Sequence, residues 1–356
     1  MSTGEGARRP TLDPASAAIR TAVREALTAH PDGAACRASR AARAASRSAP
    51  QVIVAVSGGA DSMALLSACA FLHRRGELRA RAVCVDHGLQ PGSAEVAERV
   101  RATASEWGVD TEVVAVEVTG GLEGLEAAAR TARYRVLEDA RRRSGASWVL
   151  TAHTRNDQAE TVLLGLLRGS GTRSLAGMAP TTGRILRPLL GLDRALTEAS
   201  CRAQGIAVWD DPMNADAAFA RVRARTLLAR LEAELGQPIT ANLARTADLC
   251  RADADCLDEW AESVLEQLTG RAETRPDEMG LAGLGVLDDA ILSRVLRSWL
   301  LSLGVPAQNL GAERIADLCR LVRTRVGRGP TRLSLPGDTE VVVGRDRLRF
   351  RTVDVP

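Results

Sequence analysis

The chain has 356 residues, 45% of them apolar, so it can bury a large core in two or more domains. Its 47 Lys and Arg positions are all arginine, and 44 acidic residues leave a net charge of only +3. The lack of lysine excludes a Walker A lysine, a Schiff-base lysine and a lysine nucleophile. Seven scattered cysteines without a Cys-x-x-Cys pair argue against a disulfide framework and a zinc or iron–sulfur site.

Residues 1–49 are rich in alanine, arginine and serine, and we predict that they form an N-terminal low-complexity extension with one helix from about Pro14 to Ala29. The sequence contains no apolar run of membrane-spanning length and no signal-peptide core after the N-terminus. Together with the cysteine pattern, this indicates a protein of a reducing, cytoplasmic compartment that has no membrane partner.

The most informative segment joins an expected strand to an expected helix through a loop of small residues. The β-branched run 52–56 breaks into Ser57, Gly58, Gly59, Ala60, Asp61 and Ser62, and an apolar-periodic segment follows. Free N–H groups at the helix start, glycines that let the backbone come close and two serine hydroxyls all suit a phosphate. Asp61 would repel a phosphate, which suggests that Mg²⁺ bridges it to a polyphosphate. An ordinary strand–turn–helix connection remains the alternative.

Strands and helices are expected to alternate from Val52 to about Pro212. The expected strands cover 52–56, 81–85, 111–118, 148–152, 185–187 and 206–209, and the expected helices cover 62–75, 93–107, 125–144 and 157–168. Alternation at this spacing predicts an α/β fold with a Rossmann-like, doubly wound parallel sheet. Because ligands of such sheets bind at the carboxyl ends of the strands, we expect the functional site there.

The pattern changes to helices alone beyond Arg225. One expected helix carries Leu257, Trp260 and Val264 on a single apolar face, and two more helices follow it. The tail from Thr331 to Val353 alternates short apolar runs with turn signals, which predicts a small β-meander. We therefore expect a catalytic domain over 50–235 and a helical domain with a short β tail over 236–356.

Two further motifs lie after the second strand and on the third helix of the alternating region. His87 stands beside a glycine at an expected strand end, where it could contact a nucleotide, although a capped turn explains it equally well. Arg130 and Arg133 lie three residues apart and share one face of a helix, where they could neutralise phosphates. An exposed ion pair between Glu126 and Arg130 is the alternative.

The fourth strand leads into His153 and Asp157, and a later turn leads into two arginines. Asp157 could complete a Mg²⁺ site with Asp61, although it could also cap the helix that it opens. Arg221 and Arg225 are four residues apart, which places both guanidinium groups on one helical face as a fork for phosphate. A solvated start of a basic helix is the alternative for these two.

The segment from Ser57 to Ser62 resembles the signature of the PP-loop ATP pyrophosphatases, which cleave ATP between its α- and β-phosphates. Taken with the motifs around His87, Arg130, His153 and Arg221, and with the Arg-Pro-Leu-Leu run 187–190, the chain resembles the tRNA(Ile)-lysidine synthetases. The similarity runs from about Val52 to Leu235. It implies a fold of the adenine nucleotide alpha hydrolase type.

The resemblance implies that L-lysine is ligated to carbon 2 of the wobble cytidine in tRNA(Ile) with a CAU anticodon. ATP would first adenylate the cytosine oxygen and release diphosphate, after which the lysine side-chain amine would displace AMP. A 2-thiolation enzyme of the same superfamily and a non-catalytic nucleotide-binding protein of the same fold are the rival interpretations. A homodimer is compatible with all three.

The resemblance also implies a role for each candidate residue. The ATP site would comprise Ser57, Gly58, Gly59, Ala60, Asp61, Ser62, His87 and Arg133. The catalytic residues would be Asp61, Asp157, His153 and Arg130, with Mg²⁺ held by Asp61 and Asp157 and with His153 as the candidate general base. The tRNA-binding residues would be Asn214, Arg221 and Arg225, supported by the helical domain.

Overall fold

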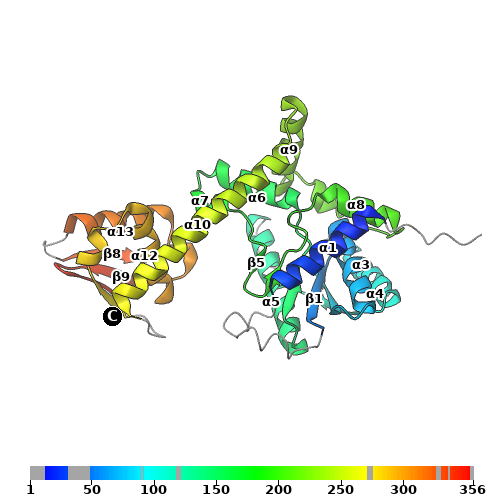
Figure 1. Ribbon diagram of the computed structural model, residues 1–356, viewed down its shortest axis with the longest axis horizontal. Helices are drawn as coiled ribbons and strands as arrows, with labels where there is room; N and C mark the ends of the chain where they lie inside the picture. The colour runs from blue at the N-terminus through cyan, green and yellow to red at the C-terminus, as the bar shows by residue number, and fades with distance from the viewer. Residues whose placement is uncertain are drawn as a thin grey trace, which may run out of the picture. The chain divides into compact units, whose positions relative to one another are not determined.

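The computed structural model describes residues 13–30, 49–88, 90, 92–117, 122–270, 276–325, 330–335 and 337–352. The chain divides into two compact units, Met1–Asp248 and Leu249–Pro356 (Figure 1). Within the described ranges, no helix has both the length and the apolarity that crossing a bilayer requires. Most of the predicted N-terminal extension, residues 1–12 and 31–48, lies outside the described part.

The first unit is built on a six-stranded sheet of order β3-β2-β1-β4-β6-β5. Its strands are β1 (Gln51–Val56), β2 (Arg79–Asp86), β3 (Asp110–Ala115), β4 (Trp148–Leu150), β5 (Thr181–Thr182) and β6 (Ile185–Leu186). All neighbouring pairs run parallel except β5 and β6. The predicted Rossmann-like fold is confirmed. Because the chain leaves β1 for β2 on one side and returns to β4 on the other, the end of β1 is the topological switch point where such sheets bind ligands.

Helices cover both faces of this sheet because the side chains of β1 alternate. Val52, Val54 and Val56 join a core cluster with α3 (Ala60–Arg74), α4 (Ser93–Glu106) and α8 (Arg194–Ala203). Ile53 points to the opposite face and joins a separate cluster with α5 (Leu122–Ser144). A strand that is buried on both faces consists of consecutive apolar residues. Such a run predicted β1 in the sequence.

Helix α1 (Pro14–Ala29) has the predicted bounds and packs against both α3 and α8. Its apolar side chains Ile19 and Val23 are fully buried in the main cluster of the first unit. Since the sheet covers α3 on one side and α1 covers it on the other, α3 is apolar around most of its circumference. Part of the N-terminal extension is thus a structural layer of the first unit.

The remaining elements of the first unit follow β4. They are α6 (Arg155–Leu167), α7 (Thr172–Leu175), the 3-10 turn η2 (Pro212–Ala215), α9 (Ala220–Leu235) and the start of α10 (Ile239–Thr269). The prediction of a strand over 206–209 is wrong. The chain there runs along the loop after β1 instead, since the backbone N–H of Trp209 donates to the carbonyl of Gly58 at 2.9 Å.

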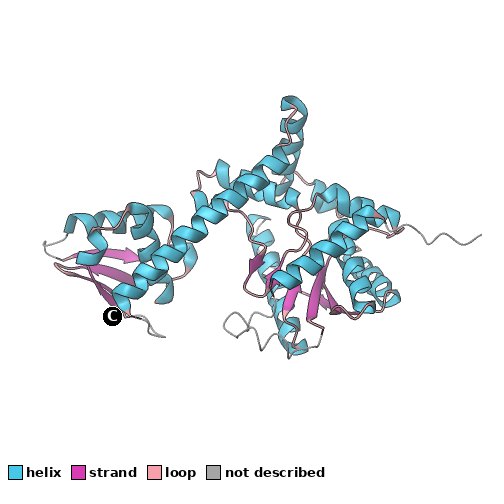
Figure 2. Cartoon of the chain, in the orientation of Figure 1, coloured by secondary structure: helices cyan, strands magenta, loops and turns pink. Residues whose placement is uncertain are grey.

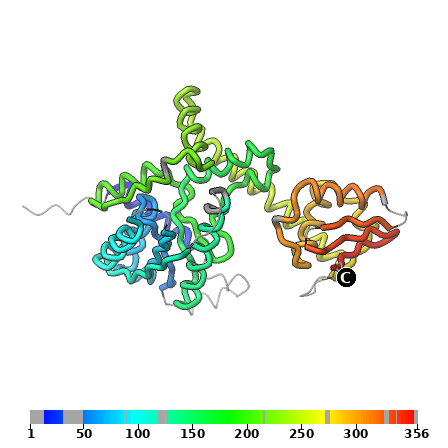
Figure 3. Tube along the Cα trace, turned by 180° about the vertical axis from the view of Figure 1, so that it is seen from behind, coloured from blue at the N-terminus to red at the C-terminus, as the bar shows by residue number. Residues whose placement is uncertain are grey.

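The second unit combines helices with a four-stranded antiparallel sheet of order β7-β10-β9-β8 (Figures 2 and 3). Its elements after α10 are β7 (Glu278–Gly280), α11 (Ala282–Gly285), α12 (Asp289–Ser302), η3 (Ala307–Asn309), α13 (Ala312–Arg325), β8 (Thr331–Leu335), β9 (Thr339–Val343) and β10 (Arg347–Thr352). The predicted meander is confirmed, whereas the three-residue strand β7 was missed. Trp260 is also not on a buried face, because it is 55% exposed.

Candidate active site

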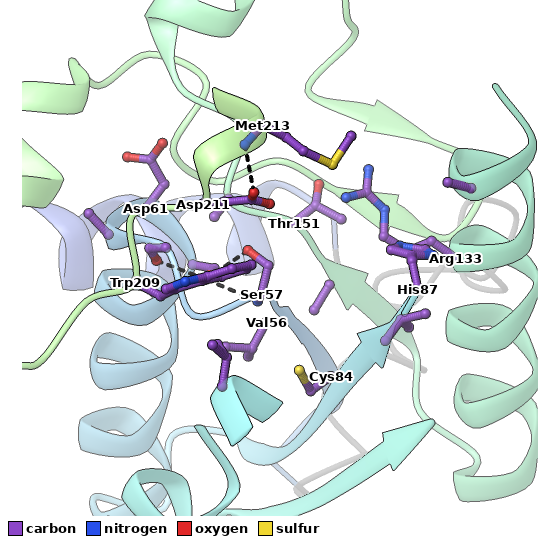
Figure 4. Close-up of a pocket in the computed structure, with 18 of the residues that line it drawn as sticks. Val56, Ser57, Asp61, Cys84, His87, Arg133, Thr151, Trp209, Asp211 and Met213 are labelled. Carbon is purple, nitrogen blue, oxygen red and sulfur yellow. Dashed lines mark hydrogen bonds between the residues drawn. The ribbon is translucent and has the colours of Figure 1, made fainter. Parts of the chain in front are cut away.

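A pocket of about 630 Å³ opens at the carboxyl ends of β1, β2 and β4 (Figure 4). Its lining includes most of the predicted residues, namely Ser57, Gly59, Ala60, Asp61, Ser62, His87, Arg130, Arg133, His153, Asp157, Arg221 and Arg225. Gly58 lies in the same loop without lining the pocket. Asn214 lies in η2, and its side chain is outside the described part of the chain. The structure therefore gathers motifs that are up to 168 positions apart into one cavity.

The loop after β1 is held in shape by its own serines and glycines. Ser57 donates its backbone N–H to Ser62 Oγ at 3.1 Å, and Ser62 Oγ donates to the carbonyl of Gly59 at 2.9 Å. Gly58 has φ +87°, and a Cβ there would lie 2.8 Å from Val96 Cγ1. Helix α3 then starts at Ala60 without a side-chain cap, and the residues of its first turn, Ala60, Asp61 and Ser62, line the pocket. Such a helix start attracts anions.

One guanidinium group joins the acidic residues of the pocket. Arg194 Nε lies 3.2 Å from Asp61 Oδ2, its Nη2 donates to Asp157 Oδ1 at 2.9 Å, and its Nη1 lies 3.7 Å from Glu160 Oε1. The hydroxyl of Thr197 donates a hydrogen bond to the other carboxylate oxygen of Asp61, Oδ1. Arg194, Thr197 and Glu160 were not found from the sequence, although Glu160 lies one helical turn after Asp157 and could have been.

The two aspartates respond differently to this environment. Burial raises the pKa of Asp61 above its usual range, although the hydrogen bond from Thr197 and the charge of Arg194 oppose the rise. Burial acts in the same direction on Asp157. There the charge of Arg194 and the backbone N–H of Thr154 outweigh burial and lower the pKa below its usual range. Asp157 is not the N-cap of α6 but its third residue, and it forms a capping box with the N-cap residue Thr154, whose N–H donates to Asp157 Oδ2 at 2.7 Å.

Asp61 and Asp157, the predicted Mg²⁺ ligands, both line the pocket and both contact Arg194. The two carboxylates contact different nitrogens of one guanidinium group, Nε and Nη2, so they are neighbours within the pocket. Within the described ranges, no group of three or more His, Cys, Asp or Glu side chains could form an all-protein metal cage. Mg²⁺ typically takes one or two carboxylates and fills its other positions with water and substrate phosphates. The donor set therefore fits Mg²⁺ better than a structural metal.

The other end of the pocket is basic. Arg130 and Arg133 lie over the ring of Tyr134, with Cζ 5.1 and 5.5 Å from its centroid. The side chain of Glu126, the alternative partner of Arg130, is outside the described part. His87 Nδ1 is buried without a hydrogen-bond partner within the described ranges, so this polar atom is available to a ligand.

His153 is half-buried between the acidic and basic ends. Burial lowers its pKa to about 3, and the charges of nearby arginines reinforce the shift, while Asp157 opposes it. Its Nδ1 is 3.0 Å from Thr151 Oγ1. The imidazole is therefore neutral near pH 7, which makes it a weak base.

Arg225 forms a partly buried ion pair. Its Nε donates to Glu160 Oε1 at 2.8 Å, and the Glu160 side chain is only 2% exposed. The second carboxylate oxygen, Glu160 Oε2, is buried without a hydrogen-bond partner in the described part of the chain. With all groups ionised, the three carboxylates of Asp61, Asp157 and Glu160 face two guanidinium groups, Arg194 and Arg225, which leaves one negative charge to attract a cation.

Two family models match the chain, a PP-loop domain over residues 35–232 and a TilS substrate binding domain over residues 280–349. Curated relatives called tRNA(Ile)-lysidine synthase match both regions together. The protein of Thermobifida fusca is 46% identical over 342 residues, which cover 94% of this chain and 98% of that protein. The chain belongs to the tRNA(Ile)-lysidine synthase family. Relatives of that name from Streptomyces coelicolor and Mycobacterium bovis are each 47% identical, over 81% and 78% of this chain and 82% of each relative.

Family membership agrees with the pocket. The PP-loop match contains every residue that lines the cavity, whereas α1 lies before the matched region. The predicted membership of the tRNA(Ile)-lysidine synthetases is thereby confirmed, and the thiolation alternative is not favoured by the curated relatives.

Proposed function

We propose that the chain ligates L-lysine to carbon 2 of the wobble cytidine in tRNA(Ile) with a CAU anticodon. ATP is consumed, and AMP and diphosphate are released through an adenylated cytidine. The single observation that carries this proposal is the 46% identity to a tRNA(Ile)-lysidine synthase along 98% of that relative's length. A cytosine carbonyl oxygen is a poor leaving group until it carries a phosphate. Activation by ATP must therefore precede attack by an amine.

The loop from Ser57 to Ser62 is the proposed place of the ATP phosphates. Its support is the uncapped start of α3 together with the two serine hydroxyls. Asp61 and Asp157 are the residues that would hold Mg²⁺. A bound Mg²⁺ would neutralise the repulsion between these carboxylates and a polyphosphate. Arg130 and Arg133 are proposed to neutralise phosphate charge at the basic end of the pocket.

The lysine amine is proposed to approach the acidic end. The support is the excess negative charge there and the buried Oε2 atom of Glu160, which has no hydrogen-bond partner among the described residues and can accept one from an ammonium group. His153 is a weaker base than the sequence alone suggested, because burial lowers its pKa to about 3. We propose that His153 orients a substrate through its free ring nitrogen. An acidic side chain would then accept the proton that the amine loses.

The tRNA is proposed to reach the pocket past Arg221 on α9 and to be held by the second unit, part of which matches the TilS substrate binding domain. A cytoplasmic location fits a reaction that consumes tRNA and ATP. The homodimer stays a prediction, and light scattering on the purified protein would test it.

The decisive experiment is mass analysis of nucleosides from tRNA(Ile) transcripts after incubation with the protein, ATP and lysine. We expect a cytidine-derived nucleoside heavier by one lysine less water. It should be absent when ATP or lysine is omitted and when methionine tRNA replaces tRNA(Ile). Diphosphate release that depends on tRNA but leaves no lysine adduct would contradict the proposal.

A thiolation enzyme would give a sulfur-dependent mass change in the same assay. The pocket disfavours that reaction. Cys84 lines the cavity, but burial raises the pKa of its thiol to about 11, whereas a reactive cysteine needs a lowered pKa.

A further inference from the structure

Trp209 lies in the pocket with its indole ring beside Ser57 (Figure 4). Its backbone is fastened to the phosphate-binding loop, since its N–H donates to the carbonyl of Gly58 at 2.9 Å. Its carbonyl oxygen would lie 3.9 Å from a Cβ placed on Gly59. The backbone from which the indole extends is therefore held against the loop. Residues 206–209 belong to no helix or strand, so the hydrogen bond to Gly58 is what positions Trp209.

Two other tryptophans differ from Trp209 in having evident structural roles. Trp299 is fully buried and donates its indole N–H to the carbonyl of Pro276 at 2.9 Å. Trp148 is also buried and donates to the carbonyl of His30 at 3.2 Å. Trp209 is only half-buried and, within the described ranges, stacks with no other aromatic ring and no arginine. A large apolar ring that is exposed in a cavity costs solvation free energy unless a ligand covers it.

The surroundings of Trp209 suit a flat aromatic ligand. Met213, Phe219 and Val222 line the same pocket on the segment that follows Trp209, so apolar side chains and the loop 57–62 face one cavity. Aromatic residues make up only 3% of this chain, yet two of them, Trp209 and Phe219, line this cavity. The ligands of the proposed reaction carry two kinds of flat ring, the adenine of ATP and the bases of the tRNA anticodon loop.

We propose that the indole of Trp209 is a stacking platform for a nucleobase at the active site. The inference rests on the proposed function, because it takes the phosphate of a nucleotide to occupy the loop from Ser57 to Ser62. In a nucleotide, a single ribose separates the base from its phosphate. A base whose phosphate occupies the loop therefore lies near Trp209, because the backbone of Trp209 is hydrogen-bonded to that loop. Stacking on an aromatic side chain tolerates any base, so the same chemistry serves adenine or an RNA base.

The test compares Trp209→Leu, which keeps apolar bulk but loses the aromatic face, with Trp209→Phe, which keeps a smaller face. ATP binding is measured by calorimetry without tRNA, and tRNA binding is measured without ATP. Loss of one base–aromatic stack should weaken binding by about 5- to 150-fold in the leucine variant. The phenylalanine variant should lose less. Trp260→Leu is the matched control for the ATP arm, because Trp260 is 55% exposed and does not line the pocket.

Each outcome is decisive. A loss confined to the ATP arm assigns the platform to adenine, and a loss confined to the tRNA arm assigns it to an RNA base. Unchanged affinity in both arms overturns the proposal even if lysidine still forms, so its failure is distinct from that of the proposed function. Should the leucine variant not fold, the phenylalanine variant and the intact protein suffice. A stacked base quenches the Trp209 fluorescence of the intact protein, and the quenching must disappear in Trp209→Phe.

Discussion

Thr197 donates a hydrogen bond from its side-chain hydroxyl to Asp61 Oδ1, although the two residues are 136 positions apart. Thr197 is fully buried on α8, and Asp61 lies in the first turn of α3. The contact uses one oxygen of the carboxylate, while Arg194 contacts the other. Asp61 is therefore oriented by helix α8, which in turn packs against α3 and α1.

Thr197→Val should slow diphosphate release by roughly 10- to 100-fold, because a hydrogen bond to a charged group contributes about 1.5–3 kcal/mol. The hydroxyl favours the ionised form of Asp61, so its loss should raise the pKa of that carboxyl further. The acid limb of the pH–rate profile should therefore move to higher pH. Thr197→Ser keeps the hydroxyl and should behave like the unmodified protein. An unshifted acid limb in the valine variant would show that Thr197 does not act on Asp61.

Asp61→Asn should leave the protein folded and reduce diphosphate release by about 10²- to 10³-fold, the usual cost of one preorganised charge contact. The reason is its place among phosphate donors, where a carboxylate is useful when a metal ion bridges it to the phosphate. Asp110→Asn, an exposed position on β3, is the control for charge. Retention of more than about a tenth of the turnover at saturating Mg²⁺ would refute the role.

Ile19→Ala should lower the free energy of unfolding by about 2–5 kcal/mol, because truncation of a buried isoleucine leaves a cavity. Ile19 is 1% exposed and joins the core that α1 shares with α3. Urea denaturation measures the change, and Thr21→Ala, at an exposed position of the same helix, is the matched control. Equal stability of the two variants would mean that α1 is not part of the folded core.

Features that leave a local sequence pattern were predictable, whereas contacts between distant parts of the chain were not. The loop 57–62 and the ends of β1, β2 and β4 were predictable, because a strand, a glycine turn and a helix leave their pattern within a few residues. Arg194 and Thr197 were not, since they act across more than 130 positions of sequence and belong to no local motif. Their partnership with Asp61 depends on how α8 packs beside α3.

Tertiary contacts also overrode local patterns at three places where the structure differs from the prediction. The apolar run 206–209 reads as a strand, but tertiary hydrogen bonding to Gly58 directs it along the loop instead. Trp260 has helical spacing with apolar neighbours, yet it lies on the outer side of α10. Strand β7 has three residues, too few to show a period, and it forms only because β10 pairs with it. In each case the tertiary environment determines the outcome and the local pattern does not.

Arg225→Gln should lower the free energy of unfolding by about 1–3 kcal/mol, because it leaves the carboxylate of Glu160 buried with less compensation. Arg194 remains 3.7 Å from the same oxygen and limits the loss. Adding Glu160→Gln to the variant removes the buried charge and should recover part of the stability. Thermal or urea denaturation of the two single variants and the double variant measures this coupling. Strictly additive effects would show that the pair does not interact in solution.

Substitution of Arg221 can distinguish a contact to RNA from a contact to ATP. Arg221 lies on α9 and lines the pocket, and it takes no part in the ion pair between Arg225 and Glu160. If Arg221 contacts an RNA phosphate, Arg221→Gln should weaken tRNA binding. It should also reduce the slope of the logarithm of affinity against the logarithm of salt concentration by about 0.7, the value for one single-strand contact. ATP binding without tRNA should then stay unchanged, and Arg223→Gln, an exposed neighbour, should alter neither. If ATP binding falls instead, the guanidinium of Arg221 belongs to the nucleotide site. If neither affinity nor slope changes, Arg221 contributes only to the solvated surface of α9.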